Sequence, residues 1–217
     1  SIERSRFCRT GAMLRKFLLL LPIFAAFLPG TSALALTAEE DAAVKEAEAY
    51  INGIKTLKAR FLQVNPDGAS VEGDVYLSRP GRMRLVYDPP TPILLVADGA
   101  FLIYVDTEMK DASHISLDDT PAGILLKDNL SFSDPAVKLC AVKLGPGIVE
   151  ITAAMSKDPS VGKLTLVFSD APFELRQWRV LDARNKEVSV TLFEAKPGVT
   201  LDRDLFRYDA RKSGGRD

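Results

Sequence analysis

Every second residue is apolar or glycine along the stretch 71–78 of this sequence. Strand side chains alternate between faces, so Val75 and Leu77 share one side of a predicted strand. Arg79 continues the same parity and falls on the apolar side. A cation there costs free energy unless acceptors meet it, so Arg79 is predicted to have partners. The alternative is that the bend at Pro80 turns it to solvent, and the pattern alone leaves both open.

The period-two pattern recurs along most of the chain and predicts a series of antiparallel hairpins. Asp98-Gly99, between two apolar runs, is a strong signal for one of the turns. The expected strands cover residues 57–64, the interrupted stretch 71–87, and residues 93–96, 101–105, 112–117, 137–144, 148–153, 163–168, 175–182 and 187–195.

Two helices accompany the strands: one precedes them, and a short one interrupts them. Thr37 and Glu40 form a capping box that predicts a helix ending near Gly53. Its apolar stripe, at spacings of three and four, consists of Val44, Ala47, Ile51 and Ile54. The second helix is expected over residues 120–126, with Thr120 as N-cap, Pro121 at the first helical position and Ile124 and Leu125 as apolar residues.

A long antiparallel sheet must curl, because strand twist accumulates and open edges are a hazard. The sequence therefore predicts a mainly β fold of the α+β type, an unclosed antiparallel barrel or strongly curved sheet. Its concave face should be apolar and covered by the two helices as lids. The residues expected in this pocket are Val75, Leu77, Met83, Leu85, Leu95, Phe101 and Ile103.

The N-terminal residues are expected to be an export signal. Met13 is the first methionine, so residues 1–12 are taken as an upstream segment. Residues 13–35 combine a basic start, an apolar run and a small-residue site, which predicts a signal peptide cut after Ala35. A membrane anchor is the alternative, but the apolar run is shorter than the roughly 20 residues that a spanning helix needs. Residues 36–217 are predicted to form one domain.

Charge and composition argue against several functions. The chain carries a net charge of -1, and its first 35 residues hold five basic residues and one acidic one, which leaves -5 for the remainder. No nucleic-acid partner is therefore expected. Once Cys8 is removed with the signal peptide, Cys140 has no intrachain partner for a disulfide.

The sequence offers little for catalysis. His114 is the single histidine and has the neighbours of an ordinary strand residue. Nucleophile, phosphate-loop and metal-ligand motifs are missing from the sequence, so neither a cofactor nor a metal is expected. These features favour a binding protein over an enzyme, and an enzyme that uses carboxylates stays the alternative.

Several segments together resemble one family. They are Gly73-x-Val75-x-Leu77-Ser78-Arg79-Pro80-Gly81-Arg82-Met83-Arg84, Val96-Ala97-Asp98-Gly99, Thr120-Pro121-Ala122-Gly123-Ile124-Leu125-Leu126 and Leu201-Asp202-x-x-Leu205-Phe206-x-Tyr208. In this order they resemble the LolA family of periplasmic lipoprotein carriers. The chain departs from the family at Met83 and Leu85, where aromatic residues are common, and methionine makes the pocket mouth more adaptable.

The resemblance implies a periplasmic chaperone that binds the acyl chains of lipoproteins. Its partners would be acylated lipoproteins, an inner-membrane ABC transporter that releases them and an outer-membrane acceptor, with the carrier itself a monomer. The family's arginine matches Arg79, which favours the inward orientation and a role as latch on the lid helices. The alternative function is a periplasmic regulatory domain that senses lipid or lipoprotein on the same half-barrel.

Overall fold

A computed structural model of the chain describes residues 36–209, and its largest element is a single antiparallel sheet of 11 strands. The strand order is β6-β5-β4-β3-β2-β1-β11-β10-β9-β8-β7. The two end strands, β6 and β7, do not pair with each other in this order. The predicted fold, an unclosed antiparallel barrel with few helices, is therefore confirmed.

The element boundaries agree closely with the pattern of the sequence. The strands are β1 (Thr56–Val64), β2 (Ser70–Ser78), β3 (Arg82–Tyr87), β4 (Ile93–Asp98), β5 (Phe101–Asp106), β6 (Asp111–Ser116), β7 (Val137–Gly145), β8 (Ile148–Met155), β9 (Gly162–Asp170), β10 (Phe173–Asp182) and β11 (Glu187–Pro197). The helices are α1 (Ala38–Gly53) and α2 (Ala122–Leu125), with short 3-10 turns η1 (Leu117–Asp119), η2 (Pro159–Val161) and η3 (Arg203–Phe206).

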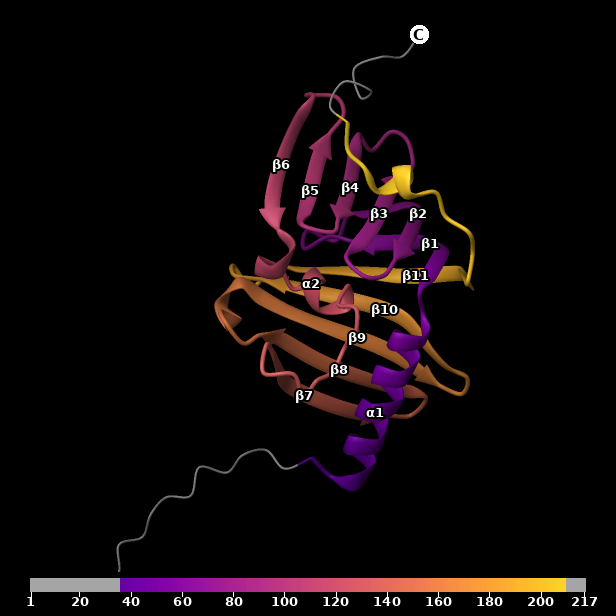
Figure 1. The fold of residues 1–217 in the computed structure, drawn as a ribbon, viewed down its shortest axis with the longest axis vertical. Helices are drawn as coiled ribbons and strands as arrows, with labels where there is room; N and C mark the ends of the chain where they lie inside the picture. Colours follow the sequence, from indigo (N-terminus) through magenta and orange to yellow (C-terminus); the bar gives the residue numbers. More distant parts are fainter. Residues whose placement is uncertain (1–35, 210–217) are drawn as a thin grey trace, which may run out of the picture. The chain divides into compact units, whose positions relative to one another are not determined.

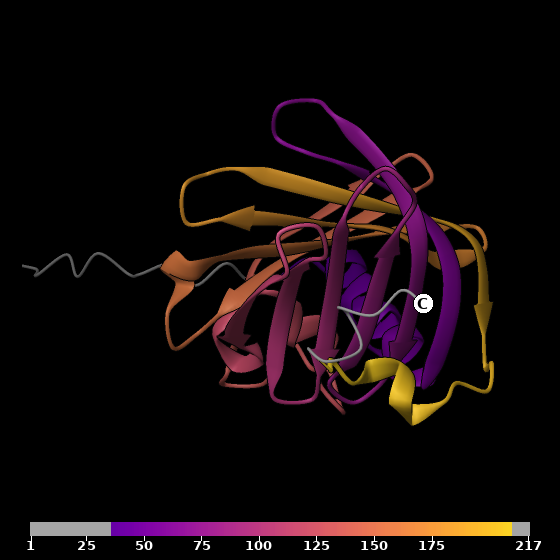
Figure 2. The ribbon, with the colours of Figure 1, turned by 90° about the horizontal axis from the view of Figure 1, so that it is seen from above.

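The sheet bends around the two helices. In Figure 1, α1 crosses the strands from β7 to β10, while α2 lies where the two halves of the sheet meet. Figure 2 shows the strands curving over α1. We call the sheet face against α1 and α2 the inner face and the opposite one the outer face. The inner face holds most of the buried apolar side chains.

The N-terminal helix begins as predicted. The hydroxyl of Thr37 accepts a hydrogen bond from the Glu40 N–H at 3.2 Å, and the Glu40 carboxylate accepts one from the Thr37 N–H at 2.8 Å. Its apolar stripe points to the sheet, where the side chain of Ile51 is 1% exposed. Because a capping box joins two backbone donors to side chains, the start of this helix follows from local sequence.

The second helix differs in its start from the prediction. The Thr120 hydroxyl donates to the Leu117 carbonyl at 2.9 Å, and no side chain caps α2, which begins after Pro121. The predicted threonine cap is therefore wrong. The hydroxyl is buried at the end of η1, where the Leu117 carbonyl accepts hydrogen bonds from both the Thr120 hydroxyl and the Thr120 N–H.

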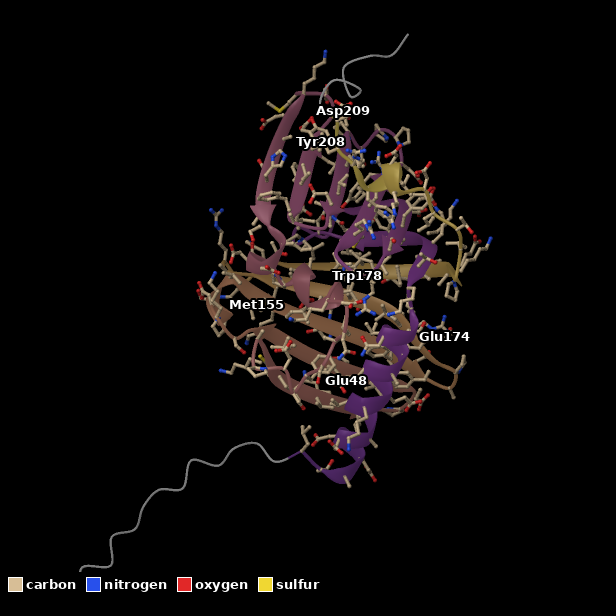
Figure 3. All side chains as sticks on the ribbon, in the orientation of Figure 1. Glu48, Met155, Glu174, Trp178, Tyr208 and Asp209 are labelled. Carbon is tan, nitrogen blue, oxygen red and sulfur yellow. The ribbon has the colours of Figure 1, made fainter. Side chains whose placement is uncertain are left out.

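Two of the expected pocket residues lie on the wrong face. Leu95 pairs with Tyr104, so even-numbered residues of β5 share the inner face, and Phe101 and Ile103 point to the outer one. Phe101 is 46% exposed, whereas Ile103 is buried in a separate outer cluster that Tyr208 covers. Their assignment to the pocket is corrected. The strand is apolar on both faces because the C-terminal segment packs on its outer side, as Figure 3 shows for Tyr208.

The N-terminal predictions fall on residues that the structure does not describe. The upstream segment 1–12 and the signal peptide 13–35 lie outside the described residues, and the domain 36–217 stays a prediction. Within residues 36–209, no helix combines the length and the apolar character that crossing a bilayer requires.

Gly73 in β2 tests the packing of the inner face. A Cβ atom at this position would lie 2.1 Å from the Val86 backbone oxygen and 2.7 Å from the Phe61 ring. We therefore expect Gly73→Ala to lower the free energy of unfolding by about 3 kcal/mol, because the Val86 oxygen belongs to the backbone of β3 and moves only with the sheet. Urea denaturation measures this value.

Gly53 at the end of α1 supplies the control. A Cβ atom there has nothing within 4 Å. Gly53→Ala should change the free energy of unfolding by less than about 1 kcal/mol. Equal effects of the two substitutions would show that close approach at Gly73 is not the cause.

Candidate functional site

A small apolar cavity lies between the inner face and the two helices. Its volume is about 10 Å³, close to the space that one water molecule requires. It is lined by Ile51, Ile54, Leu57, Val75, Leu77, Arg79, Leu125, Leu175 and Trp178. The helices leave no room for a larger ligand in this cavity, so such a ligand could enter it only if they moved.

Arg79 is the charged residue at this cavity. It follows the last residue of β2, and only 5% of it is exposed. Its Nη1 donates to the backbone oxygen of Ile51 and, at 3.5 Å, to that of Ile54, both at the C-terminal end of α1. Its Nη2 donates to the backbone oxygen of Lys127, just past α2. One guanidinium thus joins the ends of both helices to the sheet.

The ends of the two helices explain why a cation fits here. The last carbonyls of a helix lack intrahelical partners and carry the negative end of the helix dipole. The last turn of α1 contains no basic residue of its own. Arg79, which approaches from the sheet, supplies the positive charge that this turn lacks and adds a donor to the Ile51 carbonyl, which also accepts from the Ile54 N–H at 3.1 Å.

Burial acts against the charge of Arg79. Desolvation lowers the pKa of its guanidinium, and the charge of Asp128 partly opposes that shift. An arginine side chain stays protonated at any physiological pH. Burial therefore lowers the free energy of unfolding and does not neutralise the side chain. The Nε atom is buried without a hydrogen-bond partner. The guanidinium of Arg79 is therefore held through its two terminal nitrogens.

The turn after β2 adds backbone contacts to the same helix ends. The Arg79 N–H donates to the Lys55 carbonyl, and the Gly81 N–H donates to the Leu126 carbonyl, both at 2.8 Å. Side-chain and backbone bonds from Arg79 and Gly81, on either side of Pro80, therefore meet the ends of α1 and α2. Asn52 is a further partner, because its Oδ1 accepts from Arg79 Nη2 at 3.2 Å.

The structure brings most of the predicted site residues together. Arg79, Val75, Leu77, Ile51, Ile54 and Leu125 line the cavity. Val44, Ala47, Met83, Leu85 and Ile124 are buried in the same cluster without lining it, and Leu95 packs against that cluster. The structure gives the positions of these residues, whereas their roles as pocket, lid or latch stay predictions.

Strand alternation missed Trp178, which lies on β10 near α2 in Figure 3. An irregularity in the pairing of β9 with β10 falls between Leu175 and Gln177 and shifts the alternation by one residue. Leu175 and Trp178 consequently share the inner face, although they are three positions apart. Asn52 was missed because a polar residue near the end of a helix gives no signal of a distant partner.

Catalytic groups do not converge at the cavity. His114 lies on β6 between the rings of Phe101 and Tyr208, with centroids 6.3 and 6.4 Å away, on the outer side. Among residues 36–209, no group of three or more histidine, cysteine or acidic side chains is placed to hold a metal ion. The site offers apolar surface and one buried cation, which suits binding of an apolar ligand.

Comparison with known proteins gives a family match. The family model described as outer membrane lipoprotein carrier protein LolA matches residues 52–209. The outer-membrane lipoprotein carrier protein of Pseudomonas aeruginosa is 27% identical over 201 residues, which cover 88% of this chain and 94% of that protein. The protein of the same name from Cupriavidus pinatubonensis is 28% identical over 204 residues, covering 88% and 91%.

Solved structures were also found. A LolA superfamily protein from Nitrosomonas europaea has a TM-score of 0.46 at 10% identity, and the match covers 80% of this chain and 99% of that one. A DUF1329 family protein from Desulfovibrio piger has a TM-score of 0.49 at 12% identity, covering 79% and 96%.

Trp178 is the single tryptophan and reports on the cavity. We expect Arg79→Leu to release the ends of α1 and α2 from the sheet, because their carbonyls lose the donors that Arg79 supplies. Acrylamide should then quench the fluorescence of Trp178 severalfold more efficiently than in the wild type.

Arg176→Leu is the matched control. Arg176 lies two residues from Trp178 on β10, where it pairs with Glu174 at 2.8 Å and donates from Nε to the Ser169 hydroxyl at 3.1 Å, both residues of the sheet. Its loss removes one positive charge near the tryptophan and should leave quenching unchanged. Unchanged quenching in Arg79→Leu as well would mean that the guanidinium does not hold the helices closed.

Proposed function

Because the chain belongs to the LolA family of outer membrane lipoprotein carrier proteins, we propose that it is a periplasmic chaperone that carries lipoproteins by their acyl chains. The observation that carries the proposal is the apolar concavity of the sheet, closed by helices whose ends one buried arginine holds. Such a site can hide a lipid chain from water and can also exist without one.

The free energy gained when a lipid chain is buried determines how a carrier must bind and release it. A methylene group gains about 0.8 kcal/mol on leaving water, so a chain of some 16 carbons gains roughly 10 kcal/mol before other costs. A carrier with an open apolar pocket would bind such a chain too tightly to release it. An empty pocket that closes on itself competes with the cargo and lowers its net affinity.

Arg79 supplies this competition in the proposal. In the closed state its donors satisfy carbonyls that cargo binding would leave exposed or unpaired. A lipid chain must separate the helices from the sheet and thereby break these bonds. The hydrogen bonds of Arg79 then return when the cargo leaves, which helps release.

The proposed partners follow the direction of transport. We propose that the protein receives acylated lipoproteins from an inner-membrane ABC transporter, acts as a monomer and delivers them to an outer-membrane acceptor. It would reach the periplasm through a signal peptide over residues 13–35. No chemical step is required of the protein, since cargo changes place without a change in covalent bonds.

A transfer experiment tests the function. Inner-membrane vesicles that contain a labelled lipoprotein are incubated with the purified protein, and the soluble complex is then presented to acceptor-containing outer-membrane vesicles. Transfer to the second vesicles supports the carrier. Retention of the lipoprotein without transfer would favour a sensing role, and no capture at all would contradict both.

Arg79→Leu should separate capture from release. Without the donors of Arg79 the closed state loses charge-assisted hydrogen bonds worth about 1.5–3 kcal/mol each, so cargo release should slow at least tenfold while capture persists. The rate of lipoprotein appearance in the acceptor vesicles measures the effect. A normal release rate would contradict the latch, and Arg176→Leu again serves as the control.

Met83→Asp should impair capture. Met83 is 4% exposed and lies in the inner-face cluster, so a carboxylate there sets a charge against apolar side chains or lipid. We expect the amount of lipoprotein released from inner-membrane vesicles to fall at least fivefold, as measured by immunoblot of the soluble fraction.

Met109→Asp provides the same chemical change at a distance. Met109 is 78% exposed in the turn between β5 and β6. Capture by this variant should equal that of the wild type. Because Met83→Asp also affects stability, both variants are compared at a temperature where circular dichroism shows them folded. Equal capture by both would refute a role for the inner face.

A further inference from the structure

Asn52 joins α1 to the segment that follows α2. Its Nδ2 donates to the Leu130 carbonyl and its Oδ1 accepts from the Leu130 N–H, both at 2.8 Å. The side-chain amide therefore pairs with both backbone groups of one residue, as a neighbouring strand would. The same Oδ1 accepts from Arg79 Nη2, so Asn52 connects three parts of the site.

Glu48 extends this contact by one helical turn. Its Oε1 accepts from the Phe132 N–H at 2.6 Å and from the Ser131 hydroxyl at 3.2 Å. Glu48 and Asn52 are four residues apart and therefore lie on the same side of α1. Figure 3 shows Glu48 on α1. Together the two side chains form four hydrogen bonds to residues 130–132.

The backbone contacts lie above buried apolar side chains. Leu130 is 1% exposed and Phe132 is 6% exposed, and both belong to the same cluster as the apolar stripe of α1. The segment 127–132 thus contacts α1 through its backbone and packs into the same core through its side chains. By contrast, the turn after β2 holds the segment by Arg79 and by the bond between the Gly81 N–H and the Leu126 carbonyl.

We infer that the C-terminal half of α1 and the segment 127–132 form a single lid that opens as one body, with Asn52 as the residue that joins them and positions Arg79. When Arg79 withdraws, both bonds between Asn52 and Leu130 persist, because neither uses the guanidinium. The inference deepens the proposed function, on which it rests for its biological use. Its physical content, the coupled motion of two segments, concerns the empty protein.

A joint lid gives release an all-or-none character. Two independent lids would each close over part of the cavity and leave partly open states that retain lipid. A joint lid has only its closed and open arrangements, so the contacts from the turn after β2, with Arg79 at their centre, control the whole cavity. Asn52 is thus a positioning residue that acts through Arg79 and the lid.

Hydrogen exchange on the empty, full-length protein tests the coupling. In Arg79→Leu, the exchange rates of the amides in the last turn of α1 and of the Phe132 amide should rise by the same factor. The reason is that the lid separates from the sheet as one body. In Arg79→Leu combined with Asn52→Ala, the Phe132 amide should exchange at least about fivefold faster than those of α1, because the joining bonds are lost. Its own acceptor, Glu48, is unchanged in that variant.

Two controls make the outcome decisive. Thr56→Val in the Arg79→Leu background removes a bond of similar type to the Val199 carbonyl, at 2.7 Å and outside the lid, and should leave the two rates accelerated equally. If the double variant with Asn52→Ala fails to fold, Glu48→Ala replaces it, and the amide of Leu130 is read instead.

Unequal acceleration in Arg79→Leu alone would overturn the inference, because the two segments would then open separately. If the exchange rates still rose equally after Asn52→Ala, Asn52 would not be the residue that couples the two segments. Neither measurement uses cargo, so failure of the inference is distinguishable from failure of lipoprotein transfer, which the vesicle experiment reports.

Discussion

The buried guanidinium of Arg79 is the interaction on which the arrangement of the site depends. Two helices end over the same sheet, and each end leaves carbonyls without intrahelical donors. Arg79 donates to Ile51 in α1 and to Lys127 after α2 from one side chain. Burying a cation is unfavourable unless such acceptors are present, so the helix ends and the arginine stabilise each other only together.

In the proposed function, this mutual dependence gives the site a closed and an open state. The apolar contacts of the helices favour closure in water, while in the proposed function a lipid chain would offer the same inner face an alternative partner. The polar contacts decide between these states, because Arg79 bonds the helix ends only when they lie on the sheet. The volume of this cavity, about 10 Å³, leaves no room in it for a lipid chain while the helices lie on the sheet.

The polar contacts beside Arg79 arise from side chains far apart in sequence. Asn52 lies near the end of α1, and its partner Leu130 is 78 residues away. Glu48 reaches a residue more distant still, Phe132. Nothing in the local pattern marks either residue, since half-buried polar side chains on a helix are ordinary. They make these contacts because the fold of the chain places residues 130–132 beside α1.

The sequence by itself determined the strands, the start of α1 and the apolar parity that ends at Arg79, because alternation and capping depend on neighbours in the chain. Only the tertiary structure decided which face of β5 is inner, since Ile103 and its neighbours are apolar on both sides. It likewise decided the inward position of Trp178, which follows from a shift in strand pairing. It also gave Arg79 its partners, because the ends of two helices meet only in the folded chain.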